Sequence, residues 1–411
     1  MSRTRKVATT AALLAGVLAL SACGTNRAES PSGGGGSCDT SKGTLVVGFI
    51  APLSGSLSAL GLGMKNSTDL AVNQANQACK VPGYRLALQA EDDQSTAQIA
   101  GQAATKLSSD PNVVGVIGTL NSSTAQTTAP ILAQKKIVQI SPANTNPSLT
   151  QGDNYATAPS RPNATYFRTA TTDAIQGPFA AQFLVQKQGK KAIAVIDDGK
   201  TYGAGLAAQF AAEAKKLGAT IVAQEKVGEK DTDFSGVIGK VRPSNPDAVY
   251  YGGEYPVAGP LSKQLAGAGL NIPLMGGDGI VDAKFVQLGG KEGDLATSVG
   301  APAENLPSAK QFIDDYKAAG FSEPFSAYGV LTYDSANVII NGLAKAIGDG
   351  GTFDDSKRQA LIDAVQSTKL DGASGPVAFD QYGDTTNKVL TVYQVKGTDF
   401  APVETGAYQA S

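Results

Sequence analysis

Small hydroxyl and amide side chains cluster in residues 115–126, GVIGTLNSSTAQ, directly after an apolar run typical of a buried strand. A helix predicted to begin beside Ser122 leaves its first backbone N–H groups without partners and places the positive end of its dipole there. Such a position suits a carboxylate. The alternative is that Ser122 or Ser123 only caps the helix, because serine is common at helix N-termini.

A second polar stretch, SPANTNPSLT at residues 141–150, also follows a predicted strand. Its two prolines restrict the backbone, and amides and hydroxyls surround them. The stretch could supply backbone N–H groups to the same anion. It could equally be a polar loop, because this composition is typical of turns.

Three further stretches place a carboxylate or an aromatic ring where a helix or turn begins. They are TATTDAIQGP with Asp173, DDGKTYG with Tyr202, and MGGDGI with Asp278. Each aspartate could simply be a cap. Together, however, the carboxylates and the tyrosine face suit an ammonium group. With the hydroxyl and amide groups described above, the complementary solute is an α-amino acid zwitterion.

The chain contains no histidine among its 411 residues. This excludes Ser-His-Asp and Cys-His nucleophile pairs and every histidine-ligated metal site. No GxxxxGK or GxSxG motif occurs, and residues 61–66, GLGMKN, lack the last glycine of the dinucleotide fingerprint. Lysine, tyrosine and carboxylates remain, so the composition weakens the enzyme hypothesis without eliminating it. We expect a binding protein and not an enzyme, with no cofactor and no metal.

Residues 1–22 have the pattern of a signal peptide, with the basic segment MSRTRK before an apolar stretch too short to span a bilayer comfortably. The stretch ends in LSAC at Cys23, which looks like a bacterial lipobox. We expect cleavage before Cys23 and lipid attachment to it, so the protein would be extracytoplasmic and anchored to the cell membrane. Without the three leader cations the formal charge is −5, which does not suggest a nucleic-acid partner.

Residues 23–43 read as a flexible tether because most of them are glycine, serine and other polar residues. Cys38 and Cys79 lie in the exported part of the chain, where thiols can oxidise. The strand predicted at residues 44–50 and the helix predicted to end near Cys79 run in opposite directions. Cys79 would therefore return to the end of the sheet where Cys38 enters, and we expect a disulfide.

Strand-like and helix-like runs alternate from residue 44 onward, stop in the polar segment 144–160, and then begin again. The strand-like runs include TLVVGFI, YRLALQAE, VVGVIG, KIVQI, AIAVID, TIVAQEKV, DAVYYGG, GPVAFD and VLTVYQV. The helix-like runs between them are residues 64–78, 96–107, 124–134, 174–188, 203–217 and 256–268. This pattern predicts two doubly wound parallel sheets with a cleft between them, and in such sheets ligands bind outside the carboxyl ends of the strands.

These segments together resemble the leucine/isoleucine/valine-binding protein family, the type I extracytoplasmic solute-binding proteins of ABC importers. The family order covers residues 44 to about 394 and includes PLSG, GTLNSST, ISPANTNPSLT, YFRTATTDAIQGP, YGAGLA, DFS, NPDAVYYGG and GPVAFDQYGD. The resemblance implies an α/β fold of two doubly wound parallel-sheet lobes joined by a three-strand hinge. It implies an N-terminal lobe of residues 44–172 with 303–388 and a C-terminal lobe of residues 173–302 with 389–405.

The resemblance also implies which residues contact the ligand. Ser122, the backbone of Ala143 and the hydroxyl of Thr145 would hold the α-carboxylate. The ammonium side of the ligand would face Asp173, Tyr202 and Asp278, and Tyr328 would lie along the cleft.

Two positions depart from the family pattern: Leu60 replaces an aromatic residue after PLSG, and Glu254 replaces a tyrosine after YYGG. A carboxylate in the cleft leaves a polar or basic amino acid open as the ligand beside a branched-chain one. We expect a monomer that delivers an amino acid to an ABC permease. The same fold could instead bind an amide or an aromatic acid, or act as a sensory module.

Overall fold

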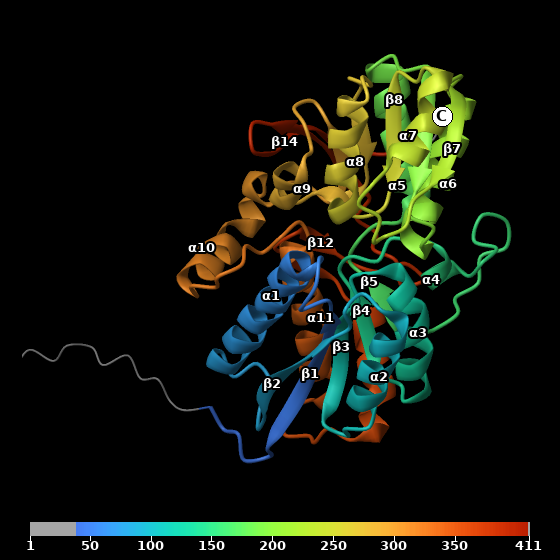
Figure 1. Cartoon of the computed structure of the whole chain (residues 1–411). Helices are drawn as coiled ribbons and strands as arrows, with labels where there is room; N and C mark the ends of the chain where they lie inside the picture. Colours follow the sequence, from blue (N-terminus) through green and yellow to red (C-terminus); the bar gives the residue numbers. More distant parts are fainter. Residues whose placement is uncertain (1–37, 410–411) are drawn as a thin grey trace, which may run out of the picture. The chain divides into compact units, whose positions relative to one another are not determined.

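The computed structural model describes residues 38–409, which contain two β-sheets with helices packed on both (Figure 1). The predicted signal peptide, the lipid attachment site at Cys23 and most of the predicted tether lie outside these residues. Within residues 38–409, no helix is long and apolar enough to cross a membrane. The bond between Cys38 and Cys79 joins the start of this region to the end of the first helix, with 5.4 Å between the two Cα atoms.

The first sheet consists of parallel strands in the order β2-β1-β3-β4-β5. Their bounds are β1 (Thr44–Ala51), β2 (Arg85–Asp92), β3 (Val113–Gly118), β4 (Val138–Ser141) and β5 (Tyr166–Arg168). Both faces of β1 are apolar, so helices must pack against both sides of the sheet at this strand. Val47 and Phe49 belong to one hydrophobic cluster, whereas Ile50 belongs to another with Leu107 and Leu132. This alternation is the reason the segment TLVVGFI folds as a strand buried on both faces.

Two pairs of helices cover this sheet, α1 with α11 and α2 with α3 (Figure 1). Helix α11 comes from far along the sequence, so the chain returns to the first sheet after building the second. The helices packed around this sheet are α1 (Ser58–Gln77), α2 (Ala97–Ser108), α3 (Ser122–Gln134), α4 (Ser148–Gln151), α10 (Lys310–Ala318), α11 (Gly329–Ile347) and α12 (Arg358–Gln366). We call this sheet with these helices the first lobe.

The second sheet has the order β14-β13-β10-β9-β8-β6-β7. The strands are β6 (Ala192–Asp197), β7 (Thr220–Lys226), β8 (Ala248–Gly252), β9 (Leu274–Gly276), β10 (Leu295–Val299), β13 (Val389–Lys396) and β14 (Asp399–Ala407). Helices α5 (Asp173–Ala181), α6 (Thr201–Lys216), α7 (Ser235–Val241), α8 (Tyr255–Gly267) and α9 (Ala283–Leu288) complete the second lobe. The predicted parallel sheet is confirmed for β6 to β10, but β13 and β14 form an antiparallel hairpin on its edge.

Two predicted elements differ from the structure. Helix α1 begins at Ser58 instead of residue 64. Its first two turns contain Gly61 and Gly63, and glycine is a weak helix former, so the sequence pattern does not indicate these turns. Gly61 is needed there because a Cβ would overlap the carbonyl oxygen of Pro52. In GPVAFD, only β12 (Gly375–Val377) is a strand, and it pairs with β11 (Leu370–Gly372) outside both large sheets. Pro376 lacks the N–H group that an interior strand needs.

Candidate functional site

One small cavity lies where polar segments that follow strands of both sheets meet. Residues of both lobes line it: Leu60, Leu120, Asn121, Ser122, Ala143, Tyr202, Glu254, Asp278, Gly279 and Tyr328. The structure therefore brings together most of the side chains that the sequence singled out. The cavity has a volume of only about 10 Å³, so its walls must separate to admit a solute larger than water.

The first wall of the cavity is the start of helix α3. Asn121 precedes the helix in an extended conformation, and its side chain makes no capping hydrogen bond. The Ser122 hydroxyl is buried and lies 3.5 Å from the backbone nitrogen of Asn146, outside its own helix. Ser122 therefore faces the neighbouring loop instead of capping α3, and the positive end of the helix dipole points at the cavity.

The second wall is the loop 141–146, which follows β4. The Ser141 hydroxyl donates to the Thr119 carbonyl (2.9 Å) and accepts from the N–H groups of Ala143 (3.2 Å) and Asn144 (2.9 Å). The loop thus bends sharply after the strand, and Ala143 reaches the cavity.

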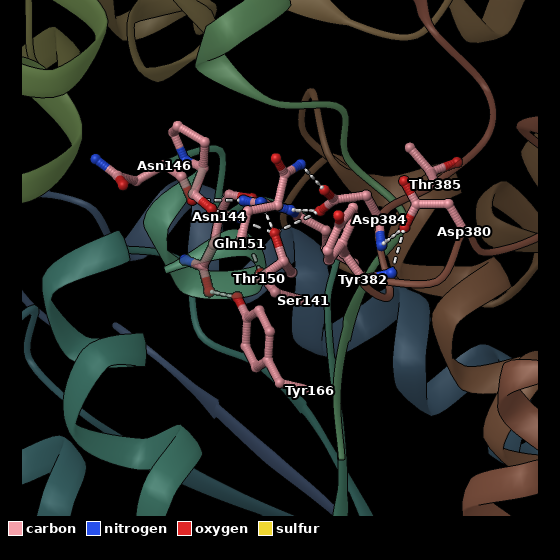
Figure 2. Close-up of polar contacts among 12 residues, drawn as sticks. Ser141, Asn144, Asn146, Thr150, Gln151, Tyr166, Asp380, Tyr382, Asp384 and Thr385 are labelled. Carbon is pink, nitrogen blue, oxygen red and sulfur yellow. Dashed lines mark hydrogen bonds and ion pairs between the residues drawn. The ribbon is translucent and has the colours of Figure 1, made fainter. Parts of the chain in front are cut away.

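A buried ion pair between Arg168 and Asp384 stabilises this loop. Arg168 donates to Asp384 through Nε (2.5 Å) and to the carbonyl oxygens of Asn144 (3.2 Å) and Asn146 (2.8 Å). Figure 2 shows Asp384 beside Thr150 and Gln151, which donate to its two oxygens at 2.8 and 2.7 Å. Burial acts to raise the pKa of Asp384, but Arg168 and these donors outweigh it and lower that pKa. The conformation of the loop therefore depends on the buried guanidinium group of Arg168, which donates to two of its carbonyl oxygens.

Asp278 forms the acidic wall of the cavity. Its Oδ1 accepts from Gln176 Nε2 (2.7 Å) and from the Tyr202 hydroxyl (2.8 Å), and its Oδ2 accepts from the Tyr328 hydroxyl (2.8 Å). The Tyr202 oxygen in turn accepts from the Gly279 N–H at 3.0 Å. Burial raises the pKa of Asp278, and the three donors act against that rise. Asp278 thus lines the cavity, held by three hydrogen bonds, and does not act as a helix cap.

The structure differs from the sequence expectation for Asp173 and Thr145, neither of which lines the cavity. Both lie behind its wall, where the Asp173 N–H donates to the Thr145 carbonyl at 2.8 Å. Asp173 is fully buried, and burial, followed by the neighbouring Asp278, raises the pKa of Asp173 well above its ordinary value. A raised pKa favours the neutral carboxyl group, which suits an ammonium ion less well than a carboxylate does. Gln176 bridges Asp173 to Asp278 instead.

Glu254 faces the cavity from the segment between β8 and α8. Asn121 Nδ2 of the first lobe donates to its Oε1 at 2.7 Å. Its position depends on Gly253, whose φ of 155° favours glycine. A Cβ added at this position would overlap the Tyr251 hydroxyl. Leu60 lines the same cavity from α1. Both departures from the family pattern thus lie in the site.

The sequence reasoning missed Asn121 and Gly279, which line the cavity, and Gln176, which lies behind its wall and donates to Asp278. All three lie within the stretches NSST, TATTDAIQGP and MGGDGI that it had singled out. The composition of these stretches indicates a site, but the sequence does not show which residue of each stretch faces the cleft.

Comparison with known proteins gives consistent matches over nearly all of the described chain. Residues 44–400 match the family model described as "Periplasmic binding protein". The leucine-, isoleucine-, valine-, threonine-, and alanine-binding protein of Pseudomonas aeruginosa is 30% identical over 85% of this chain and 90% of its own length. The Leu/Ile/Val-binding protein homolog 3 of Brucella melitensis is 29% identical over 85% and 91%. The crystal structure of a leucine binding protein, LivK, from Thermotoga maritima superposes with a TM-score of 0.77 at 27% identity, over 88% of this chain and 98% of that one.

Proposed function

The chain belongs to the periplasmic binding proteins of the leucine/isoleucine/valine-binding family, and on that premise we propose that it captures an α-amino acid between its lobes. The family consists of solute-binding proteins, so the chain is not an enzyme. In this proposal the protein releases its amino acid to an ABC permease in the membrane. The mature protein is held outside the cytoplasm by lipid on Cys23.

One observation supports the proposal: a single cavity has one wall that suits the carboxylate of an α-amino acid and another wall that suits its ammonium group. The start of α3, with Ser122 and Ala143, offers positive partial charge and a hydroxyl to a carboxylate. Asp278 offers a negative charge to an ammonium group, and Tyr202 and Tyr328 hold it in place. A solute with only one of these charges would leave one wall without a partner.

Closure would couple binding to delivery. The lobes are joined across the cleft by the Tyr328–Asp278 and Asn121–Glu254 hydrogen bonds and by Asn146 Nδ2, which donates to the Thr201 carbonyl at 2.7 Å. A ligand that contacts both lobes shifts the equilibrium between open and closed forms. In the proposal the hinge crosses between the lobes near residues 172, 302 and 388, and the permease recognises the closed form.

The proposal is tested by calorimetry on the purified full chain, unfolded and refolded to remove any bound solute. Ser122→Ala and Asp278→Asn should each weaken binding of the preferred amino acid by at least about tenfold, the loss expected for one charge-assisted hydrogen bond. Ser123→Ala and Asp314→Asn are the matched controls, because Ser123 does not line the cavity and Asp314 is exposed on α10. If both site variants keep the wild-type affinity, or if the chain binds only amides or aromatic acids, the proposal is wrong.

A further inference from the structure

A second cavity, of about 310 Å³, lies beside the first and shares Glu254 with it. Both lobes contribute to its walls. The lining residues are Ser54, Gly55, Ser56, Leu57, Gln94, Ser95, Thr96, Asp198, Lys200, Glu229, Lys230, Glu254, Pro256 and Val257. A ligand held in the first cavity could therefore extend past Glu254 into a larger and mainly polar space.

Two carboxylates meet at the junction of the cavities because β6 and β8 are adjacent parallel strands. Asp197 pairs with Gly252 in the sheet, and the Asp198 N–H donates to the Gly252 carbonyl at 3.0 Å. Asp198 and Glu254 thus leave the carboxyl ends of neighbouring strands. Burial, followed by the nearby Glu254, raises the pKa of Asp198 to about 8.

Three buried oxygen atoms at this junction have no hydrogen-bond partner within residues 38–409: Asp198 Oδ2, Asn121 Oδ1 and the Tyr251 hydroxyl. Asp198 is only 8% exposed and lines the second cavity, and Asn121 is 4% exposed and lines the first. All three atoms can accept hydrogen bonds, and a buried acceptor without a donor is unfavourable by about 1–3 kcal/mol. The junction is therefore built to receive a group rich in N–H donors.

The charges around the second cavity leave room for one cation. Lys200 forms an ion pair with Glu229, so its ammonium group already has an acidic partner. With Lys230 counted as well, two lysines and three carboxyl groups line the cavity, and the raised pKa of about 8 leaves Asp198 mostly protonated at pH 7. A positively charged group placed between Asp198 and Glu254 would favour the ionised form of Asp198, because an opposite charge nearby stabilises a carboxylate and offsets the repulsion from Glu254.

We propose that the bound amino acid has a cationic side chain, an ammonium or a guanidinium group that reaches past Glu254 and lies between Glu254 and Asp198. This inference rests on the proposed function, because the first cavity must hold the α-amino and α-carboxyl groups. Leu60 of the first cavity and Leu57 of the second provide apolar contacts for the methylene groups between the two ends. Glu254 and Asp198 are then the residues that determine specificity.

Calorimetry with matched pairs of amino acids tests the charge directly. Arginine and citrulline share shape but not charge, and lysine and norleucine differ in the terminal ammonium. We expect the full chain to bind arginine or lysine at least about tenfold more tightly than its neutral counterpart at pH 7, as for one charge-assisted hydrogen bond. Equal or tighter binding of the neutral amino acids, or of leucine, would overturn the inference and leave the proposed function intact. If no amino acid binds, the proposed function fails as well.

Variants then locate the interaction. Glu254→Gln and Asp198→Asn should each weaken binding of the cationic amino acid by about tenfold and change binding of its neutral counterpart by less than about twofold. Asp314→Asn, which removes the same charge from the exposed face of α10, should change neither. Equal losses for the charged and the neutral amino acid would show that the two carboxylates only maintain the shape of the site, and would overturn the assignment.

A pH series gives an independent readout. If the cation displaces the proton of Asp198, affinity for arginine rises about fivefold between pH 7 and pH 8 and then levels off, while affinity for citrulline does not change. The charged or titratable groups around Asp198 are Glu254, Lys200, Glu229, Lys230, Asp197 and Tyr251. An identical pH profile for arginine and citrulline would contradict the role of Asp198.

Discussion

The ion pair between Arg168 and Asp384 allows a sharp prediction, because both side chains are completely buried. Arg168→Met would keep much of the side-chain volume and remove the positive charge. Asp384 would then be left with Thr150 and Gln151 as donors, and the carbonyl oxygens of Asn144 and Asn146 would lose theirs. The variant thus strands a negative charge inside the protein.

We expect Arg168→Met to lower the free energy of unfolding by about 3–5 kcal/mol, the usual effect of removing one partner of a buried ion pair. For the 374 residues from Cys38 to Ser411, an unfolding entropy of about 2.1 cal/mol/K per residue converts this to a fall of roughly 4–6 °C in the melting temperature. Since the chain has no tryptophan, unfolding is best followed by circular dichroism. Lys310→Met, which breaks the exposed pair with Asp314, is the control and should leave the melting temperature nearly unchanged.

The pH dependence tests the cause of this loss. In the wild type the folded-state pKa of Asp384 is lowered, so its contribution to stability is present above about pH 4, its unfolded pKa, and is lost as the pH falls through the folded pKa. Without Arg168, burial raises the pKa of Asp384, and the carboxyl group takes up a proton at a higher pH. The difference between variant and wild type should therefore narrow as the pH falls from 7 toward 4. A variant within 1 kcal/mol of the wild type at every pH would refute the reasoning.

Two further predictions concern stability. Cys79→Ser opens a disulfide between residues separated by 41 positions and should lower the unfolding free energy by about 2–4 kcal/mol, measured by urea denaturation of the variant against oxidised wild type; equal midpoints would show that the bond does not constrain the unfolded chain. Burial raises the pKa of Asp93 to about 6, so the contribution of its protonated form to stability is full below about pH 4 and is lost as the pH rises through 6; Asp93→Asn should therefore reduce the fall in unfolding free energy between pH 4.5 and pH 7 by about 2 kcal/mol. Parallel stability curves for that variant and the wild type would contradict this origin of the slope.

The sequence carried most of the fold because the repeating unit is local. The segment TLVVGFI is apolar on both faces, which is enough to indicate a strand covered on both sides. The helices between the strands are indicated by the spacing of their own apolar residues. The antiparallel β13–β14 hairpin was not predicted, since strand direction at a sheet edge depends on partners far away in the sequence.

The candidate site divides in the same way. Ser122, Tyr202 and Asp278 were predicted because each lies at the end of a strand or the start of a helix. The burial of Asp173, which raises the pKa of its carboxyl group, is a property of three-dimensional packing. The meeting of Asp198 with Glu254 depends on β6 lying beside β8, which periodicity does not reveal.

The order in which the two sheets are completed has a consequence for synthesis. The first sheet has all its strands once Arg168 has been made, but its covering helix α11 follows more than 150 residues later. The second sheet lacks β13 and β14 until residues 389–407 have been made, so β10 presents an open edge until then. Neither lobe can complete its packing until α11, β13 and β14, all in the last part of the chain, have been synthesised. A product that ends before residue 389 would therefore expose β10 to aggregation instead of forming one working half of the protein.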